Sequence, residues 1–183
     1  RERQLALIAR VRELEARTRA ASEKAKPLFD KRGQLLPRER IARLLDAGAP
    51  WLELSSLAGY CLDNPDPEKS VPGGGMVAGI GYVSGVRAIV VASDSGIDAG
   101  AIQHMGREKL LRAQELALAN KLPFVHLVES AGANLLKYRV EGFIHGGAIF
   151  YNLAKLSAAG GGGAVHHRDH WNAGGRKLRE VVE

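Results

Sequence analysis

The chain of 183 residues has a single cysteine, Cys61, and therefore lacks any intrachain disulfide. A lone cysteine is typical of a reducing compartment, and packing of a small side chain is its expected role. No apolar run is long enough to span a membrane, and the charged start RERQLALIAR does not have the pattern of a secretory signal. These absences predict a cytoplasmic protein without membrane contact. The mitochondrial matrix is the alternative compartment, since the chain begins without methionine.

Aromatic residues are also scarce, at 5% of the chain. The formal net charge of +6 is therefore not accompanied by the interleaved basic and aromatic residues of a base-stacking module, and nucleic acid is not an expected partner. Much of the excess positive charge lies between Arg1 and Arg43, where a polyanionic small molecule such as a nucleotide-bearing cofactor fits equally well. The hydrophobic content of 45% is sufficient for one packed domain.

The first part of the chain predicts helices followed by a loop. Apolar residues recur with helical spacing at Leu5, Ile8, Val11 and Leu14. Residues 4–24 are therefore expected to form an amphipathic helix that packs on a larger body. A second short helix is expected to begin at Pro37 and to stop at Gly48. Residues 51–54 are a strand candidate, and the prolines and consecutive glycines of residues 63–75 predict a loop.

Two apolar runs rich in valine and isoleucine come next, Met76 to Val83 and Val86 to Ser93. They flank Ser84-Gly85, a dipeptide that favours a tight turn, and so predict a β-hairpin in the core sheet.

The following segments predict a layered α/β fold. A helix is expected from Gln103 to Asn120, a buried strand from Leu122, and a further helix from Gly146 to Ala159. The last helix is expected to carry Ile149, Phe150, Leu153 and Leu156 on one face. The order hairpin, helix, strand, helix is typical of sheets whose strands are connected by crossover helices.

The strand that starts at Leu122 ends in a run of small residues, Ser130-Ala131-Gly132-Ala133-Asn134. No bulky side chain in this run shields the peptide N–H groups from a ligand. A pair of such amides in a dry site stabilises an oxyanion, and the loss of one donor typically costs about 3 to 4 kcal/mol of barrier. A plain exit from strand to loop is the alternative that this segment alone supports equally well.

Three segments resemble one known family: GMVAGIGYVSGVRAIVVASD, EKLLRAQELALANKLPFVHLVESAGANL and IFYNLAKLSAAG. They are similar to the N-terminal half of the carboxyltransferase (β) subunit of biotin-dependent acyl-CoA carboxylases, of the methylcrotonoyl-CoA and geranyl-CoA type. The resemblance runs from about Arg1 to Gly160. It implies a crotonase-like α/β fold of ββα units, incomplete at the C-terminal end. The implied organisation is a helical segment (1–50), a truncated carboxyltransferase domain (51–160) and an atypical tail (161–183).

The resemblance also implies a reaction and its partners. A carboxyl group passes from carboxybiotin, carried by a biotin carboxylase/biotin carrier α subunit, to the enolate of an acyl-CoA thioester such as 3-methylcrotonoyl-CoA. Other β subunits are further expected partners. No side-chain base is required, which agrees with a sequence that offers no convincing Ser/His/Asp or Cys/His set.

On this resemblance the small-residue turn belongs to the thioester pocket. Gly132 and Ala133 are expected to line it by main-chain groups, with Ala133 as the first oxyanion donor. Ala131 is expected to contact the substrate. Asn134 is a further candidate, although its side chain is equally suited to capping the turn.

The chain departs from the family after Gly160, where it continues GGGAVHHRDHWNAGGRKLREVVE instead of a hydrophobic strand. Gly174 and Gly175 fall roughly where the family has AGG at a helix N-terminus, and they are candidate donors of the second oxyanion amide. A frameshifted or artificially terminated reading of the gene is the alternative. Because glycines raise the entropy cost of ordering, residues 161–183 are expected not to form the strand, which leaves the sheet edge beside Val125 unpaired.

Several other residues suggest sites only weakly. Possible metal ligands in the tail are His166, His167, Asp169 and His170, but the flanking glycines argue against a helix there, and no metal site is predicted. Lys109 and Arg112 are expected on a solvated helix face, with a CoA phosphate as the alternative contact. His104 and His145 are expected as ordinary core or surface histidines, with the acyl pocket as the alternative. Residues 73–75 are expected to form a flexible loop beside the active site.

Two functional classes remain open. The first is an acyl-CoA carboxyltransferase half-site, and the second is a non-catalytic or degenerate crotonase-like module that binds CoA thioesters or a subunit partner. In the family the active site lies between the N-terminal domain of one subunit and the C-terminal domain of another. The chain alone is therefore expected to be catalytically incomplete.

Overall fold

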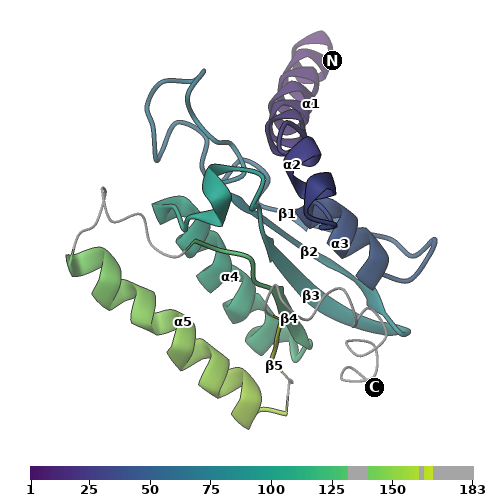
Figure 1. Ribbon diagram of the computed structural model, residues 1–183, viewed down its shortest axis with the longest axis vertical. Helices are drawn as coiled ribbons and strands as arrows, with labels where there is room; N and C mark the ends of the chain where they lie inside the picture. Colours follow the sequence, from purple (N-terminus) through teal and green to yellow (C-terminus); the bar gives the residue numbers. More distant parts are fainter. Residues whose placement is uncertain (132–139, 161–162, 167–183) are drawn as a thin grey trace.

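A five-stranded sheet in the order β1-β2-β3-β4-β5 forms the centre of the molecule (Figure 1). The computed structural model describes residues 1–131 and 140–160 in full and residues 163–166 by their backbone. The strands are β1 (Leu52–Leu54), β2 (Met76–Val83), β3 (Val86–Ser93), β4 (Phe124–Leu127) and β5 (Gly163–His166). The helices are α1 (Glu2–Glu23), α2 (Lys26–Lys31), α3 (Pro37–Leu44), α4 (His104–Asn120) and α5 (Val140–Ala158), together with the short 3-10 helix η1 (Asp98–Gly100).

The predicted hairpin of β2 and β3 is confirmed. The strands pair antiparallel from Met76 with Ser93 to Val83 with Val86. Ser84 and Gly85 have φ values of 52° and 80°, the left-handed conformations that suit a two-residue hairpin turn.

The other half of the sheet is parallel. β3 pairs with β4, and β4 pairs with β5, so that Val125 lies between Val90 and Ala164. The expectation that the chain after Gly160 leaves this edge unpaired is therefore wrong. The crossover helix α5 returns the chain to the edge of β4, and Gly160 at φ 72° allows the reversal. β5 can pair with β4 without an apolar run, because the hydrogen bonds between parallel strands are made by main-chain groups.

Helices cover both faces of the sheet, with α4 and α5 on one side and α3 on the other (Figure 1). The core on the α3 side contains Ile41, Leu44, Val77, Val83, Val90, Ala92, Val125 and Leu127. The core on the α4 side contains Met76, Ala78, Ile89, Val91, Leu110, Ala113, Ala117, Phe124 and Leu156. Alternate residues of β3 thus enter opposite cores, as the pleat of a strand buried on both faces requires.

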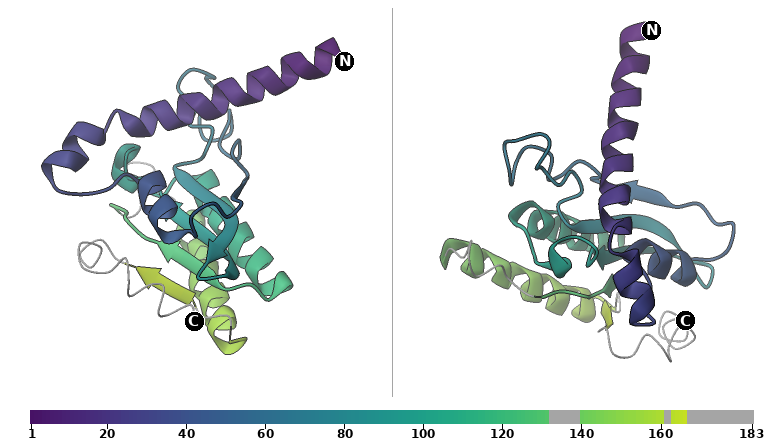
Figure 2. Two further views of the ribbon diagram at one scale, coloured as in Figure 1. Left: turned by 90° about the vertical axis from the view of Figure 1, so that its right-hand side faces the viewer. Right: turned by 45° about the horizontal axis from the view of Figure 1, so that its top comes forward.

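The two outermost helices differ from expectation. α5 begins at Val140, six residues before the predicted start. Of the residues expected on one face, Leu156 is buried whereas Phe150 is 74% exposed. α1 projects from the body at its N-terminal end (Figure 2). Only its later part packs, since Leu14 is buried whereas Leu5 is 58% exposed.

Candidate functional site

The loops that follow β3 and β4 meet at the carboxyl end of the parallel strands. The hydroxyl of Ser130 donates to the carbonyl oxygen of Gly100 at 2.6 Å. The N–H of Ala131 donates to the carbonyl oxygen of Ala99 at 3.1 Å. In α/β sheets ligands bind outside the carboxyl ends of the strands. The candidate site is therefore at this end of the sheet, between the two loops.

The 3-10 helix η1 has an uncommon backbone conformation. Asp98, Ala99 and Gly100 have φ values of 47°, 51° and 73°, although two of these residues carry a Cβ. A left-handed non-glycine residue costs of order 1 kcal/mol or more and persists only where its surroundings enforce it. At Gly100 a Cβ would overlap the carbonyl oxygen of Glu129, so only glycine allows the two loops to approach this closely.

A buried ion pair fixes the start of the loop after β4. Glu129 and Arg40 lie 3.0 Å apart, and their side chains are 9% and 6% exposed. The hydroxyl of Ser95 donates to the Glu129 carboxylate at 2.7 Å. Arg40 belongs to α3, so the pair joins that helix to both loops of the candidate site.

A second buried carboxylate joins α1 to the loop after β3. The hydroxyl of Ser22 donates to Asp94 at 2.6 Å, and Asp94 is 1% exposed. Burial raises the pKa of the Asp94 carboxyl, while the Ser22 hydrogen bond and the nearby guanidinium groups of Arg38 and Arg40 oppose the rise. The hydrogen bond between Ser22 and Asp94 holds α1 against the loop after β3.

The triple glycine before β2 is tightly packed, which corrects the expectation of a flexible loop. Gly73, Gly74 and Gly75 are buried, and a Cβ at Gly106 of α4 would overlap the carbonyl oxygen of Gly74. Lys109 is also buried, not on a solvated face, and it donates to the carbonyl oxygens of Met76 at 2.8 Å and Gly73 at 3.4 Å. Burial lowers the pKa of Lys109 to about 8. With its amine held by two carbonyls, Lys109 is not placed to meet a CoA phosphate.

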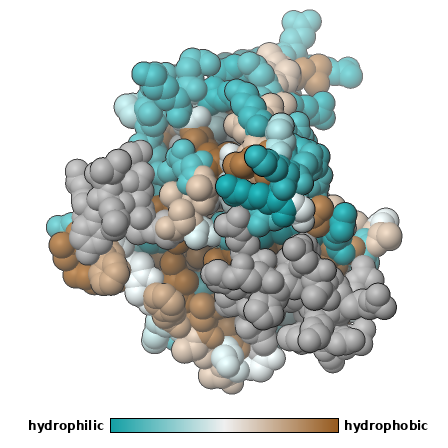
Figure 3. Space-filling model, in the orientation of Figure 1, coloured by the Kyte–Doolittle hydropathy of each residue, from teal (hydrophilic) through white to brown (hydrophobic). Residues whose placement is uncertain are grey.

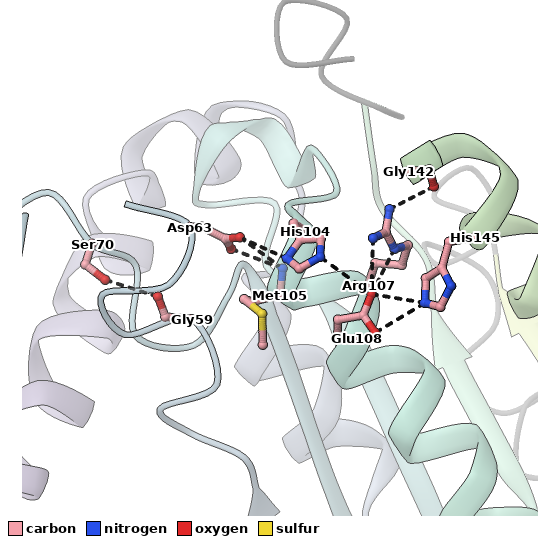
Figure 4. Close-up of polar contacts among 9 residues, drawn as sticks. All are labelled: Gly59, Asp63, Ser70, His104, Met105, Arg107, Glu108, Gly142 and His145. Carbon is pink, nitrogen blue, oxygen red and sulfur yellow. Dashed lines mark hydrogen bonds and ion pairs between the residues drawn. The ribbon is translucent and has the colours of Figure 1, made fainter. Parts of the chain in front are cut away.

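Asp63 caps the first turn of α4 (Figure 4). Its carboxylate oxygens accept the N–H of Met105 at 3.1 and 3.2 Å, and one oxygen lies 3.7 Å from Nδ1 of His104. A carboxylate at a helix N-terminus accepts a hydrogen bond from an otherwise unpaired amide and interacts favourably with the helix dipole. His104 is a surface histidine, since its side chain is 64% exposed.

Arg107 and Glu108 join α4 to the start of α5 (Figure 4). Nη1 of Arg107 donates to the carbonyl oxygen of Gly142 at 2.8 Å, and Nε2 of His145 lies 3.3 Å from the Glu108 carboxylate. Partial burial tends to raise the pKa of Glu108, but hydrogen bonds from Arg107 and His145 lower it below its ordinary value. The contact holds α5 against α4 at the end where the chain arrives from β4.

Most of the sequence-predicted site residues lie outside the described residues. These are Gly132, Ala133, Asn134, Gly174 and Gly175, and their roles stay predictions. Ala131 is described and exposed at the candidate site, but its N–H is engaged by Ala99.

Of the tail histidines, His166 ends β5, whereas His167, Asp169 and His170 lie outside the described residues. Among the residues that the structure describes, no group of three or more His, Cys, Asp or Glu side chains is arranged to hold a metal ion. Within the same ranges, no helix has the length and apolar character needed to cross a membrane.

Sequence reasoning missed the residues that hold the two loops together, chiefly Glu129, Arg40 and Gly100. A signal was present for Glu129, which follows Phe124 to Val128 directly in the strand segment. An acidic residue so close to a fully buried strand is rarely buried without a partner. The partner on α3 could not be chosen from the many arginines of the first part of the chain.

Comparison with known proteins places the chain in a family. Residues 30–160 match the model of the carboxyl transferase domain. The chain is 45% identical over 145 residues to the probable mitochondrial methylcrotonoyl-CoA carboxylase beta chain of Drosophila melanogaster, covering 78% of this chain and 24% of that relative. It is 44% identical over 150 residues to the biotin-dependent 3-methylcrotonyl-coenzyme A carboxylase beta1 subunit of Mycobacterium tuberculosis, covering 80% and 27%. The chain thus spans about a quarter of the length of these curated relatives.

Solved structures agree with the sequence comparison. The beta subunit of geranyl-CoA carboxylase from P. aeruginosa matches with a TM-score of 0.80 and 52% identity, over 88% of this chain and 30% of that chain. Transcarboxylase 12S matches with a TM-score of 0.70 at 22% identity, a likeness of fold alone. The crotonase-like α/β fold that the sequence predicts is confirmed.

Proposed function

Because this chain belongs to the carboxyl transferase domain family, we propose that it forms the acyl-CoA half of a site that carboxylates a branched enoyl-CoA, such as 3-methylcrotonoyl-CoA or geranyl-CoA. The observation that carries the proposal is the match over residues 30–160, with 45% and 52% identity to beta subunits named for these two substrates. The relatives' names describe proteins about four times as long, so the activity is assigned to the assembled enzyme.

The chain's own contribution is to bind the thioester and to stabilise its enolate oxygen with main-chain N–H groups. Small side chains in the loops after β3 and β4 support this role, because they leave backbone groups accessible. The Ala131 N–H is engaged by Ala99, so the donors are assigned further along the chain. We assign Ala133 as the first oxyanion donor and Gly174 with Gly175 as the second.

Three further residues are assigned to binding the thioester. Gly132 and Asn134 line it beside the first donor, and Ala131 contacts it through its methyl or carbonyl group. The buried pair of Arg40 and Glu129 holds the base of this turn in place, because Glu129 precedes Ser130 directly. Positioning of this kind is a large part of carboxyl transfer when no side-chain base takes part.

The carboxyl group itself must come from a partner. Biotin supplies an activated carboxyl group in carboxylases of this kind, and the Mycobacterium tuberculosis relative is named as biotin-dependent. We therefore assign biotin to a carrier α subunit, with other β subunits as further partners. The cytoplasm or the mitochondrial matrix is the proposed compartment, and the Drosophila melanogaster relative is named as mitochondrial.

Calorimetric titration of the chain with 3-methylcrotonoyl-CoA, geranyl-CoA and free CoA tests the thioester site. We expect both thioesters to bind more tightly than free CoA, and the variant Gly132→Val to lose this preference because a β-branched side chain shields neighbouring amides. Ala119→Val is the matched control, since Ala119 is exposed near the opposite end of α4. A folded chain that binds no thioester at millimolar concentration, or a Gly132→Val variant with unchanged affinity, would contradict the proposal.

A further inference from the structure

A pocket with a volume of about 390 Å³ lies between the sheet and the end of α4. Its sheet side is one row of cross-strand neighbours, since Leu52 of β1 pairs with Ile80 of β2, and Ile80 pairs with Ile89 of β3. Ile89 in turn pairs with Phe124, the first residue of β4. The pocket is therefore at the end of the sheet opposite the candidate site.

The helix side of the pocket is formed where α4 stops. Leu116 and Asn120 line it from the last turn of the helix, and Leu122 lines it from the segment that leads into β4. Ile80, Leu116 and Leu122 are partly buried and pack against the core on the α4 side. Pockets that bind small molecules typically have volumes of about 300 to 1,000 Å³, mostly apolar walls and few polar groups. This pocket has all three properties.

One cation lines the pocket. Arg87 precedes Ile89 by two residues and therefore projects from the same face of β3. Its Nε and Nη2 atoms donate to the hydroxyl of Tyr82 at 3.3 and 3.1 Å, and its guanidinium carbon lies 5.7 Å from the centre of the Tyr82 ring. These contacts orient the guanidinium group but use only two of its five N–H donors. Among the residues that the structure describes, no carboxylate pairs with Arg87.

The other polar residue of the lining adds no charge. The Asn120 side chain donates from Nδ2 to the carbonyl oxygen of Leu116 at 2.8 Å. A ligand that fits this lining has a hydrocarbon body, which gains free energy by leaving water, and one anionic group for the guanidinium. A planar carboxylate matches the free N–H groups of an oriented guanidinium better than a spherical anion does.

We infer that this pocket binds a medium-chain monocarboxylate. The hydrocarbon chain lies against Ile80, Leu116 and Leu122, and the carboxylate accepts hydrogen bonds from Arg87. The pocket shares no residue with the thioester site, so this inference stands or falls separately from the proposed carboxylation.

Titration of the full 183-residue chain with octanoate, followed by NMR of labelled methyl groups, tests the inference. We expect saturable shifts of the Ile80, Leu116 and Leu122 methyl signals, with a dissociation constant of about 1 mM or below. Octanol has the same carbon chain without the charge and should bind about tenfold more weakly. Octylamine should bind more weakly than octanol, because its ammonium group faces the Arg87 guanidinium.

Two variants separate the charge from the cavity. Arg87→Gln should weaken octanoate binding to the level of octanol and leave octanol binding unchanged, and Arg87 is exposed, so the chain should still fold. Leu116→Trp places a larger side chain in the pocket and should weaken both ligands at least about tenfold. Arg112→Gln is the matched control, since Arg112 is also on the surface, with a side chain 64% exposed, but does not line the pocket. Circular dichroism confirms that each variant is folded.

A second apolar surface must be distinguished from the pocket. Figure 3 shows hydrophobic surface over α5, where Ile144 and Phe150 are more than 70% exposed. Phe150→Ser should therefore leave octanoate binding unchanged, and saturation with 3-methylcrotonoyl-CoA should leave it unchanged as well. The inference would be overturned by a folded chain that shows no saturable shift at 10 mM octanoate, by equal affinity for octanoate and octanol, by insensitivity to Arg87→Gln, or by loss of binding in Phe150→Ser.

Discussion

The ion pair of Arg40 and Glu129 allows a quantitative prediction. The Arg40 Nη2 atom lies 3.0 Å from the Glu129 carboxylate, and both side chains are less than a tenth exposed. Glu129→Gln keeps the shape and an acceptor for the Ser95 hydroxyl but removes the charge that compensates the guanidinium. Breaking a buried pair in this way typically lowers the free energy of unfolding by about 3 to 5 kcal/mol. For a chain of this size the loss corresponds to a Tm lower by about 6 to 20 °C.

Urea unfolding followed by circular dichroism measures the effect. The exposed pair of Arg112 and Glu115 is the matched control, because its atoms are 3.2 Å apart but its side chains are 64% and 56% exposed. Glu115→Gln should change the free energy of unfolding by no more than about 0.5 kcal/mol. The double variant Arg40→Met/Glu129→Leu should lose less stability than the sum of the two single losses, since neither partner of the pair is then left without the other. Equal effects of Glu129→Gln and Glu115→Gln would refute the assignment of Arg40 and Glu129 as a buried, energetically coupled pair.

The central hairpin could be predicted to the residue because several local signals agree there. Valine and isoleucine favour strands, and Ser84-Gly85 suits the left-handed turn that joins them. Local propensity and the global fold thus require the same conformation, which is the condition under which sequence patterns are most reliable.

The start of α5 could not be predicted, because local and tertiary preferences conflict there. Gly142 and Gly146 disfavour a helix by about 1 kcal/mol each relative to alanine. In the structure these glycines admit the Arg107 side chain, whose hydrogen bond to Gly142 joins α5 to α4. That gain depends on a residue 35 positions earlier, so no local pattern reveals it.

The strand β5 was missed for a related reason. The glycines and the absence of an apolar run weigh against a strand when each residue is judged by its side chain. The pairing partner is the backbone of β4, which follows a crossover helix and lies ready at the edge of the sheet. Whether a segment pairs in parallel depends on how the preceding helix returns the chain to the sheet. The four residues of β5 alone do not contain that information.

The candidate site shows the same division between local and distant information. The small residues around Ala131 are evident in the sequence, and Ala131 lies in the loop that follows β4. Their supports come from far away: Gly100 contacts this turn from 30 residues earlier, through its carbonyl oxygen and Ser130. The small residues of the turn are therefore visible in the sequence, whereas the distant residues that hold its start in position are not.

Two further variants test the packing beside the site. Gly100→Ala should destabilise the chain by about 2 kcal/mol more than Gly85→Ala, and it should speed hydrogen exchange at Ala131. Both glycines have positive φ, so the backbone cost of alanine is similar at the two positions. Only at Gly100 would the new Cβ overlap another group, the Glu129 carbonyl oxygen, because the space at Gly85 is open. Equal losses of stability in the two variants would contradict the close contact. The last prediction concerns His126, which burial and the Arg40 charge hold at a pKa of about 4, below its ordinary 6.5. Its Nε2 atom is buried without a hydrogen-bond partner among the described residues, so a proton is costly in the folded state. As the pH falls, His126 is protonated in the unfolded chain before it is protonated in the folded chain. The free energy of unfolding should therefore have its full value above pH 6.5 and decline toward pH 4. The linkage amounts to about 2 kcal/mol at pH 5. Urea unfolding at pH 8 and at pH 5 measures how far the free energy of unfolding falls between the two pH values. This fall should be about 2 kcal/mol smaller in His126→Leu than in the unmodified chain. An identical loss in both proteins would mean that His126 is readily protonated in the folded state, and that the core beside β4 is open to water.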